Sequence, residues 1–282
     1  MLRRNPLLGL AVIILFCAIV SADEKPVASR AAGSANVVFM IGEDEYKTWE
    51  TLPQFARTEL APRGVHFTIV LEDARRKNHF PGIAEALKTA DLLVLSVRRR
   101  LPPKDELDAV RAYLNAGHPL VAIRTACHAF SPSLNATAAN APHGAAKDSW
   151  VEFDPQVLGG HYIGHWGNTP KTSITVATRA ESSTILNEVN VAQLIGNGSL
   201  YRVRPLDAAC EPILIGRIPG KDHEPVAWTR RYGPGHARVF YTSLGHPDDF
   251  AEPAFRRLLL NAIAWASDRP APSGAPPIVI DR

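Results

Sequence analysis

The first half of the chain alternates apolar runs with segments of helical character, and this alternation constrains the fold more than any other feature. Between the apolar runs, hydrophobic residues recur at helical spacing. A helix between two strands returns the chain to the same end of the sheet, so the strands run parallel. The sequence therefore predicts an α/β fold with a doubly wound, mostly parallel sheet. The four apolar runs are residues 36–41, 65–71, 91–96 and 119–123.

Boundary residues place the helices. Thr48 can cap a helix that extends to Leu60. Pro102 and Pro103 open a helix that Gly117 ends, because glycine readily adopts the left-handed conformation after a helix. Shorter or later elements are a helix over 83–88, strands over 172–178, 212–217, 226–230 and 237–242, and a closing helix from about Pro253.

The N-terminal segment has the features of a secretory signal peptide. Arg3 and Arg4 precede an apolar run over 7–20, and Ala22 ends a segment suited to cleavage. The run is shorter than the ~20 residues that span a bilayer, although an uncleaved membrane anchor stays an alternative. We expect a secreted or periplasmic protein. The predicted organisation is a signal peptide over 1–22, a flexible tether over 23–35, one α/β domain over 36–268 and a Pro-rich tail over 269–282.

Composition and charge exclude several classes of protein. With 46% hydrophobic residues, the chain can bury a large core. Loss of Arg3 and Arg4 would lower the formal charge of +3 by two, so nothing indicates a nucleic-acid partner. Cys127 and Cys210 are too few for a disulfide-dependent scaffold, and the sequence leaves their pairing and the oligomeric state open.

Polar residues follow several of the predicted strands. Glu43 and Asp44 come after the first strand, Arg98 after the third, and Arg124 and His128 after the fourth. Ligands of such sheets bind beyond the carboxyl ends of the strands. These residues are therefore expected to share one rim of the sheet.

Histidines are frequent in the turns assigned to this rim. They are His128, His161, His165 and His246. Imidazole is a ligand for zinc and other divalent transition metals, and it also serves as a general acid or base. His161 and His165 are the candidate metal ligands, but surrounding glycines disfavour the helix that would put both on one face. A metal site, acid–base or sugar-binding roles, and purely structural roles all remain open.

The charged candidates also have two interpretations each. Glu43 and Asp44 could supply a base or a ligand, or could favour the N-terminus of the next helix. Arg124 could hold a carboxylate, a phosphate or a sugar oxygen, or could pair with one of these two carboxylates. Asp248 could orient His246.

Aromatic residues offer sugar-binding surfaces. Trp150 and Trp166 lie in a long segment with little periodicity and could stack on a sugar ring. Trp150 could instead anchor that segment to the core.

Several motifs resemble the ThuA-like (trehalose-utilisation) family. They occupy residues 121–130, 158–162, 224–229, 238–250 and 261–266, in the family's order. The resemblance implies a flavodoxin-like sheet of the class I glutamine amidotransferase kind. It also implies a role in sugar metabolism beside a sugar oxidoreductase, with a keto-sugar or glycoside as substrate.

The amidotransferase comparison raises the question of a thiol nucleophile. Cys127 and the His246-Pro247-Asp248 segment are similar to parts of a Cys–His–acid triad. However, Arg124 occupies the position directly after the strand, without flanking glycines. We therefore predict that the nucleophile elbow is absent and that Cys127 is a small buried thiol.

The resulting hypothesis is an enzyme that acts on a keto-sugar or keto-glycoside. His246 or a carboxylate would remove a proton next to the carbonyl, and Arg124 or a bound metal would stabilise the enolate. His128, Trp150 and Trp166 would bind the sugar. The alternatives are a non-catalytic carbohydrate-binding protein and a thiol-dependent, amidotransferase-like hydrolase.

Overall fold

The computed structural model describes residues 35–132, 149–270 and 272–274. The predicted signal peptide and nearly all of the predicted tether lie outside these residues. Within the described part of the chain, no helix has both the length and the apolar character needed to cross a membrane.

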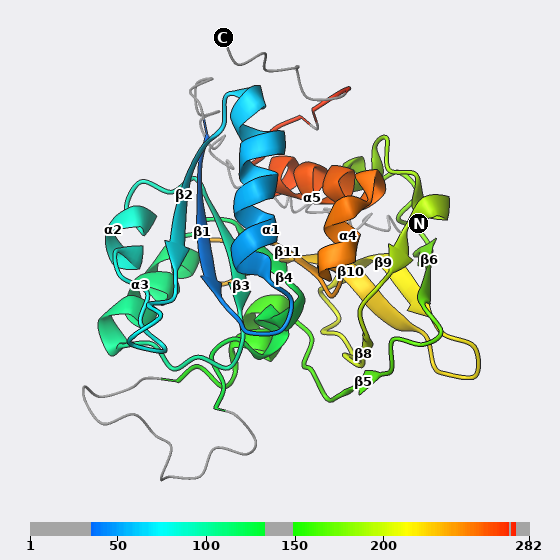
Figure 1. The fold of residues 1–282 in the computed structure, drawn as a ribbon, viewed down its shortest axis with the longest axis horizontal. Coiled ribbons are helices and arrows are strands. Elements are labelled where there is room, and N and C mark those ends of the chain that lie inside the picture. Colours follow the sequence, from blue (N-terminus) through cyan, green and yellow to red (C-terminus); the bar gives the residue numbers. More distant parts are fainter. Residues whose placement is uncertain (1–34, 133–148, 271, 275–282) are drawn as a thin grey trace, which may run out of the picture. The chain divides into compact units, whose positions relative to one another are not determined.

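A nine-stranded sheet forms the centre of the domain (Figure 1). The five strands from β2 to β11 run parallel, and the last four are joined antiparallel to their neighbours. The predicted α/β fold with a mostly parallel sheet is confirmed. The order is β2 (His66–Leu71), β1 (Asn36–Gly42), β3 (Leu92–Val97), β4 (Leu120–Ile123), β11 (Ala237–Thr242), β10 (Glu224–Tyr232), β9 (Glu211–Arg217), β6 (Thr172–Val176) and β7 (Ile195–Gly196).

Helices cover both faces of the parallel strands. Alternate residues of β1 separate into two cores, with Val37 and Phe39 on one face and Val38 and Met40 on the other. The first core includes residues of α1 and α5, and the second includes residues of α2 and α3. The sheet is therefore doubly wound. The helices are α1 (Thr48–Phe55), α2 (Ile83–Leu87), α3 (Lys104–Asn115), α4 (Pro247–Ala251) and α5 (Pro253–Ala266).

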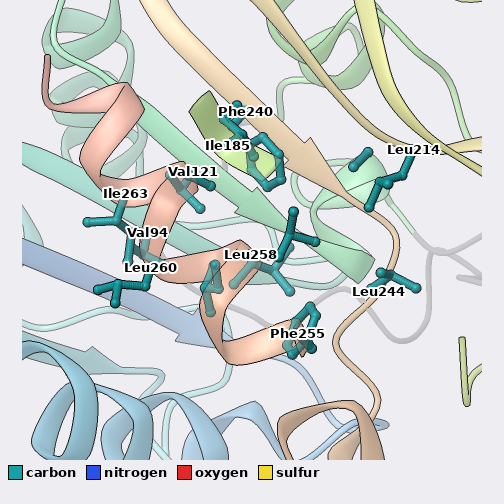
Figure 2. Packing of buried hydrophobic residues seen from close by; sticks show 14 of the residues in the cluster. Val94, Val121, Ile185, Leu214, Phe240, Leu244, Phe255, Leu258, Leu260 and Ile263 are labelled. Atoms are coloured by element: carbon teal, nitrogen blue, oxygen red, sulfur yellow. The ribbon is translucent and has the colours of Figure 1, made fainter. Parts of the chain in front are cut away.

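Helix α5 fills the first core. Figure 2 shows its side chains Phe255, Leu258 and Ile263 among buried residues of the strands, including Val121 and Phe240. Burying one such side chain contributes roughly 1.5–3 kcal/mol. This packing fixes the register of the central strands and hence the positions of their carboxyl ends.

The start of α1 differs from the prediction. Thr48 is the first helical residue and does not cap the helix, since the N-cap is Lys47. The carboxylate of Glu43 takes the capping role by accepting hydrogen bonds from the backbone N and the Oγ1 of Thr48, at 2.7 and 2.9 Å. By contrast, Gly117 follows α3 with a φ of 92°, as predicted.

Candidate functional site

The turns after β1, β3 and β4 meet at one rim, as expected for parallel strands. An ion pair of 2.6 Å joins Arg98 after β3 to Glu45 after β1. The backbone N of Arg99 donates to the carbonyl of His128 at 3.0 Å. Side chains far apart in sequence are thus neighbours here.

The carboxylate of Glu43 accepts its hydrogen bonds from the turn that follows it. Besides the two groups of Thr48, its carboxylate accepts hydrogen bonds from the backbone N atoms of Glu45 and Tyr46, both at 2.7 Å. The Thr48 hydroxyl lies 2.8 Å from that of Ser96 on β3. Glu43 therefore builds the segment over 43–48, here called the β1–α1 turn.

Asp44 pairs with two cations other than Arg124. Its carboxylate lies 2.8 Å from Arg100 and 3.2 Å from Lys77. Burial opposes the shift, but the hydrogen bonds and charges of these two partners lower the pKa of Asp44. Neither Glu43 nor Asp44 forms an ion pair with Arg124.

Arg124 occupies a strained position directly after β4. It begins the short helix η3 (Arg124–His128) with a φ of 47°, a conformation that is costly for a residue with a side chain. The Tyr241 hydroxyl donates to its carbonyl at 2.7 Å. A Cβ on Gly245 would lie 2.7 Å from Ile123, so the glycine beside this bend comes from the β11–α4 connection. The backbone therefore bends sharply after β4, and the residue at the bend is an arginine and not a nucleophile.

The Arg124 guanidinium is buried without a carboxylate ion pair among the described residues. It is only 2% exposed and lies between the rings of Tyr46 and Tyr201, at 3.9 and 4.6 Å from their centroids. It donates to the carbonyl of Ser243 at 2.5 Å and to Ser199 Oγ at 3.3 Å. Burial opposes the charge, but the phenol groups of Tyr201 and Tyr46 outweigh it and raise the pKa of Arg124.

Aromatic contacts link His128 and His165 to this cation. The Tyr162 ring lies 4.6 Å from that of His128 and 4.7 Å from that of Tyr201. The Tyr162 hydroxyl is 2.7 Å from Nδ1 of His165, on a two-stranded ribbon of β5 (His165–Trp166) and β8 (Leu200–Tyr201).

His128 is held neutral. Burial, followed by the charges of Arg99, Arg98 and Arg124, lowers the pKa of His128 to about 3. At neutral pH its ring can therefore exchange hydrogen bonds with a ligand but carries no charge.

A histidine–carboxylate dyad lies next to these rings. His161 Nδ1 is 2.6 Å from Oδ2 of Asp154, which begins the turn η5 (Asp154–Leu158). Asp154 is buried, whereas the His161 side chain is 59% exposed. Burial raises the pKa of Asp154 to about 6, although the charge of His161 opposes this shift. With Nδ1 bound to a carboxylate, the second ring nitrogen is free for chemistry.

The sequence singles out His161 but not Asp154. The two come together because Gly159, with a φ of 79°, ends η5 and reverses the chain. A carboxylate at the start of an apolar turn, followed by two glycines and a histidine, is the only available signal.

His246 caps α4. Its Nδ1 accepts a hydrogen bond from the backbone N of Asp248 at 3.3 Å, and the Asp249 carboxylate accepts from the backbone N of His246 at 2.9 Å. The Asp248 carboxylate lies 3.5 Å from Nδ1. Burial lowers the pKa of His246, against the opposing charges of Asp249 and Asp248. The ring makes an edge contact with Tyr46 at 6.1 Å.

The structure thus brings five of the predicted residues to one rim. Together with three neighbouring tyrosines they are here called the rim cluster. Trp150 and Trp166 pack elsewhere: Trp150 contacts Phe153, and Trp166 lies between the cations of Arg202 and Lys221. The cluster consists of Arg124, His128, His161, His165 and His246 with Tyr46, Tyr162 and Tyr201.

Both described cysteines are free thiols. Cys127 is buried in η3, and burial raises its pKa strongly. Burial also raises the pKa of Cys210, to about 11. The thiolate form, which a nucleophile requires, is therefore disfavoured at both positions.

The predicted metal ligands His161 and His165 would have few further ligands near them in the described part of the chain. Among the described residues, no group of three or more His, Cys, Asp or Glu side chains is arranged to hold a metal ion. The Nδ1 atoms of His161 and His165 already contact Asp154 and Tyr162. A carboxylate on the other nitrogen is nevertheless typical of a metal-binding histidine, so the His161 dyad would suit one ligand position.

Known proteins share this fold. A protein described as ThuA-like from Parabacteroides merdae has a TM-score of 0.60 and 16% identity, covering 86% of this chain and 93% of that chain. Another from Bacteroides uniformis has a TM-score of 0.58 and 15% identity, covering 86% and 95%. A β-galactosidase from Bacillus circulans reaches a TM-score of 0.54 at 11% identity, covering 84% of this chain but 32% of its own. No curated protein matches the sequence significantly.

At these identities the solved structures show the fold alone, and it is similar to that of class I glutamine amidotransferases. A sequence model of the trehalose-utilisation family, ThuA, matches residues 37–266 and includes every residue of the rim cluster. The chain therefore belongs to the ThuA family, which is linked to carbohydrate utilisation.

Proposed function

We propose that this protein is an enzyme that removes a proton next to the carbonyl of a keto-sugar or keto-glycoside. The observation that carries the proposal is the contact of 2.6 Å between the exposed His161 ring and the buried Asp154 carboxylate. A buried carboxylate on Nδ1 fixes the tautomer and stabilises the imidazolium that forms when the ring accepts a proton. That is the arrangement of a general base.

The rim cluster supplies the remaining functions. Burial is the main cause of the low pKa of His128, and the charges of Arg99, Arg98 and Arg124 lower it further. The same charges would stabilise the negative oxygen of an enolate. Arg124 acts through its field, because its guanidinium is buried beneath Tyr46. The neutral His128 would bind sugar hydroxyls.

His246 is proposed as a donor. Its Nδ1 accepts a backbone hydrogen bond, so in the neutral ring the proton is on Nε2. That N–H can donate to a substrate oxygen. We accordingly propose His161 as the base and His246 as an oxygen-binding group.

The test is solvent exchange at the carbon next to the carbonyl. A keto-glucoside is incubated with the full chain in D₂O, and loss of its proton signal is followed by NMR. Because a general base contributes about 10²–10⁴-fold, His161→Ala should slow exchange by that factor. His246→Ala should slow it less. His66→Ala, an exposed histidine on β2, is the matched control and should have no effect.

Undiminished exchange in His161→Ala would contradict the proposal, and exchange lost mainly in His246→Ala would move the base to that residue. The pH profile adds a second criterion. Exchange should decline as pH falls through about 6, because protonation of Asp154 removes the charge that supports the imidazolium.

A metal-assisted version uses the same residues. A divalent transition metal such as zinc, held by His161 and His165, would polarise the sugar carbonyl. Elemental analysis of protein purified without chelator, on wild type and His161→Ala, distinguishes the two versions. Stoichiometric metal that the variant loses supports metal assistance, and a metal-free, active wild type supports the base alone.

The proposed substrate implies a preceding oxidation. A keto-sugar arises when a sugar oxidoreductase oxidises a secondary hydroxyl, so an enzyme of that class would act in the same sequence. A protein that only binds carbohydrate is the second candidate, and the hollow beside Trp49 described below favours it.

A further inference from the structure

A hollow of about 320 Å³ lies between the ends of β1 and β2, and the β1–α1 turn forms part of its lining. Its lining includes Trp49 from α1, Leu71 from β2, and the charged side chains Asp44, Glu72 and Lys77. Small-molecule sites have this size and this combination of apolar surface with a few polar groups.

Exposed apolar side chains gather here. Trp49 and Leu71 are 39% and 45% exposed, and they are two of the five large hydrophobic residues exposed in the described part of the chain. Both line the same hollow. An indole left partly in water beside polar groups offers a flat apolar face whose burial by a ligand is favourable.

Three charged side chains of the hollow, Asp44, Glu72 and Lys77, form ion pairs. Asp44 pairs with Arg100 and Lys77, and Glu72 pairs with the same two cations, at 2.6 Å from Arg100 and 3.3 Å from Lys77. Glu43 also lines the hollow, and its carboxylate is bound by backbone N–H groups and by Thr48. Of the described residues that line the hollow, none is an unpaired cation that could hold an anionic ligand. Half of the Asp44 side chain and of the Lys77 side chain remains exposed, at 53% and 58%, so acceptor and donor groups are accessible.

From these observations we infer that the hollow is a carbohydrate subsite for a neutral pyranose ring. The apolar C–H face of the ring would lie on Trp49 and Leu71, and its hydroxyls would bind Asp44 and Lys77. The choice of ligand class rests on the proposed function, whereas the pocket itself does not.

The β1–α1 turn connects the subsite to the rim cluster. The turn places Asp44 in the lining of the hollow and the centroid of the Tyr46 ring 3.9 Å from the Arg124 guanidinium. A glycoside with one ring at the rim cluster would extend its second ring towards Trp49. The subsite would then distinguish glycosides from free monosaccharides.

Binding is tested without turnover. Trehalose, as a neutral disaccharide, is titrated into the full chain and into His161→Ala by calorimetry, with glucuronate as the charged comparison. Trp49→Ala should weaken trehalose binding by roughly tenfold or more, and Trp49→Phe should weaken it less because an aromatic face remains. Ile195→Ala, an exposed apolar residue on β7, is the matched control and should bind as the wild type does. Thermal melts confirm that each variant is folded.

The inference is overturned if the wild type does not bind trehalose, if Trp49→Ala binds it equally well, or if glucuronate binds more tightly. Binding that depends on Trp49 in a protein without proton exchange would refute the proposed function but leave the subsite. Where exchange is observed, Trp49→Ala should raise KM for a keto-glycoside, keep kcat, and leave KM for a keto-monosaccharide unchanged.

Discussion

Among single residues, Asp154 is a buried carboxylate that is unfavourable for stability when charged and that orients His161. Burial makes its charged form unfavourable, and the contact with His161 compensates only part of this, since the pKa remains raised at about 6. Buried groups with a shifted pKa are concentrated at functional sites. The same carboxylate then links stability to pH.

Asp154 is expected to make the stability of the protein depend on pH. The folded protein keeps the proton of Asp154 up to about pH 6, whereas the unfolded chain loses it near the ordinary value of 3.8. Burial of Asp154 therefore lowers stability as pH rises from about 4 to about 6, with no further change above. Asp154→Asn lacks this titration, so its stability relative to wild type should rise by up to ~3 kcal/mol across the window.

Urea unfolding of both proteins at pH 4 and pH 7 measures the difference. A relative stability that is the same at both pH values would show that the Asp154 carboxyl titrates normally.

At the scale of elements, the connections between strands form the site. The β1–α1 turn is ordered by Glu43 and carries Tyr46, while the connection from β7 to β8 carries Ser199. Both close around Arg124, an element-terminal residue with a strained backbone. The β7–β8 connection lies so close to the Arg124 guanidinium that position 198 requires a residue without a side chain.

Gly198→Ala tests this packing. A Cβ there would lie 2.2 Å from Nη2 of Arg124, so either the connection or the guanidinium must move. We expect a loss of about 1–3 kcal/mol, the usual cost of overpacking. Gly167→Ala is the control, because a Cβ there meets nothing within 4 Å. Thermal unfolding of the two variants should separate them clearly, and equal melting temperatures would show that the site around Arg124 is loosely packed.

In the molecule as a whole, both the parallel and the antiparallel half of the sheet contribute segments to the site. Its parallel strands bring the β1–α1 turn, η3 and the β11–α4 connection to one rim, and the antiparallel strands lead to the ribbon that carries Tyr201. The rim cluster therefore draws on segments from Tyr46 to His246. A change in the packing of either half is expected to alter the site.

Export is the prediction for the whole chain. The basic and apolar composition of residues 1–22 supports the proposal that the protein acts outside the cytoplasm. Mass spectrometry of protein recovered from a bacterial periplasm should find Asp23 as the first residue. Recovery of the intact N-terminus in the membrane fraction would instead support an anchor.

Much of the fold was predictable because its signals are local. Apolar runs, helix-ending Gly117 and the helical faces depend only on near neighbours in sequence, and the parallel order follows from the alternation of strands and helices. The prediction that Thr48 caps its helix is wrong, because the carboxylate of Glu43 binds the backbone N of Thr48 from outside the usual capping positions.

Local signals in the sequence are enough to predict the doubly wound sheet, the rim and the histidines that lie on it. The partner of each side chain depends on the tertiary structure: Asp154 for His161, two tyrosine rings for Arg124, and Arg100 for Asp44. Secondary structure depends on short-range periodicity. A site depends on distances of a few ångströms between residues far apart in the chain, and those distances are set by the packing of the whole core.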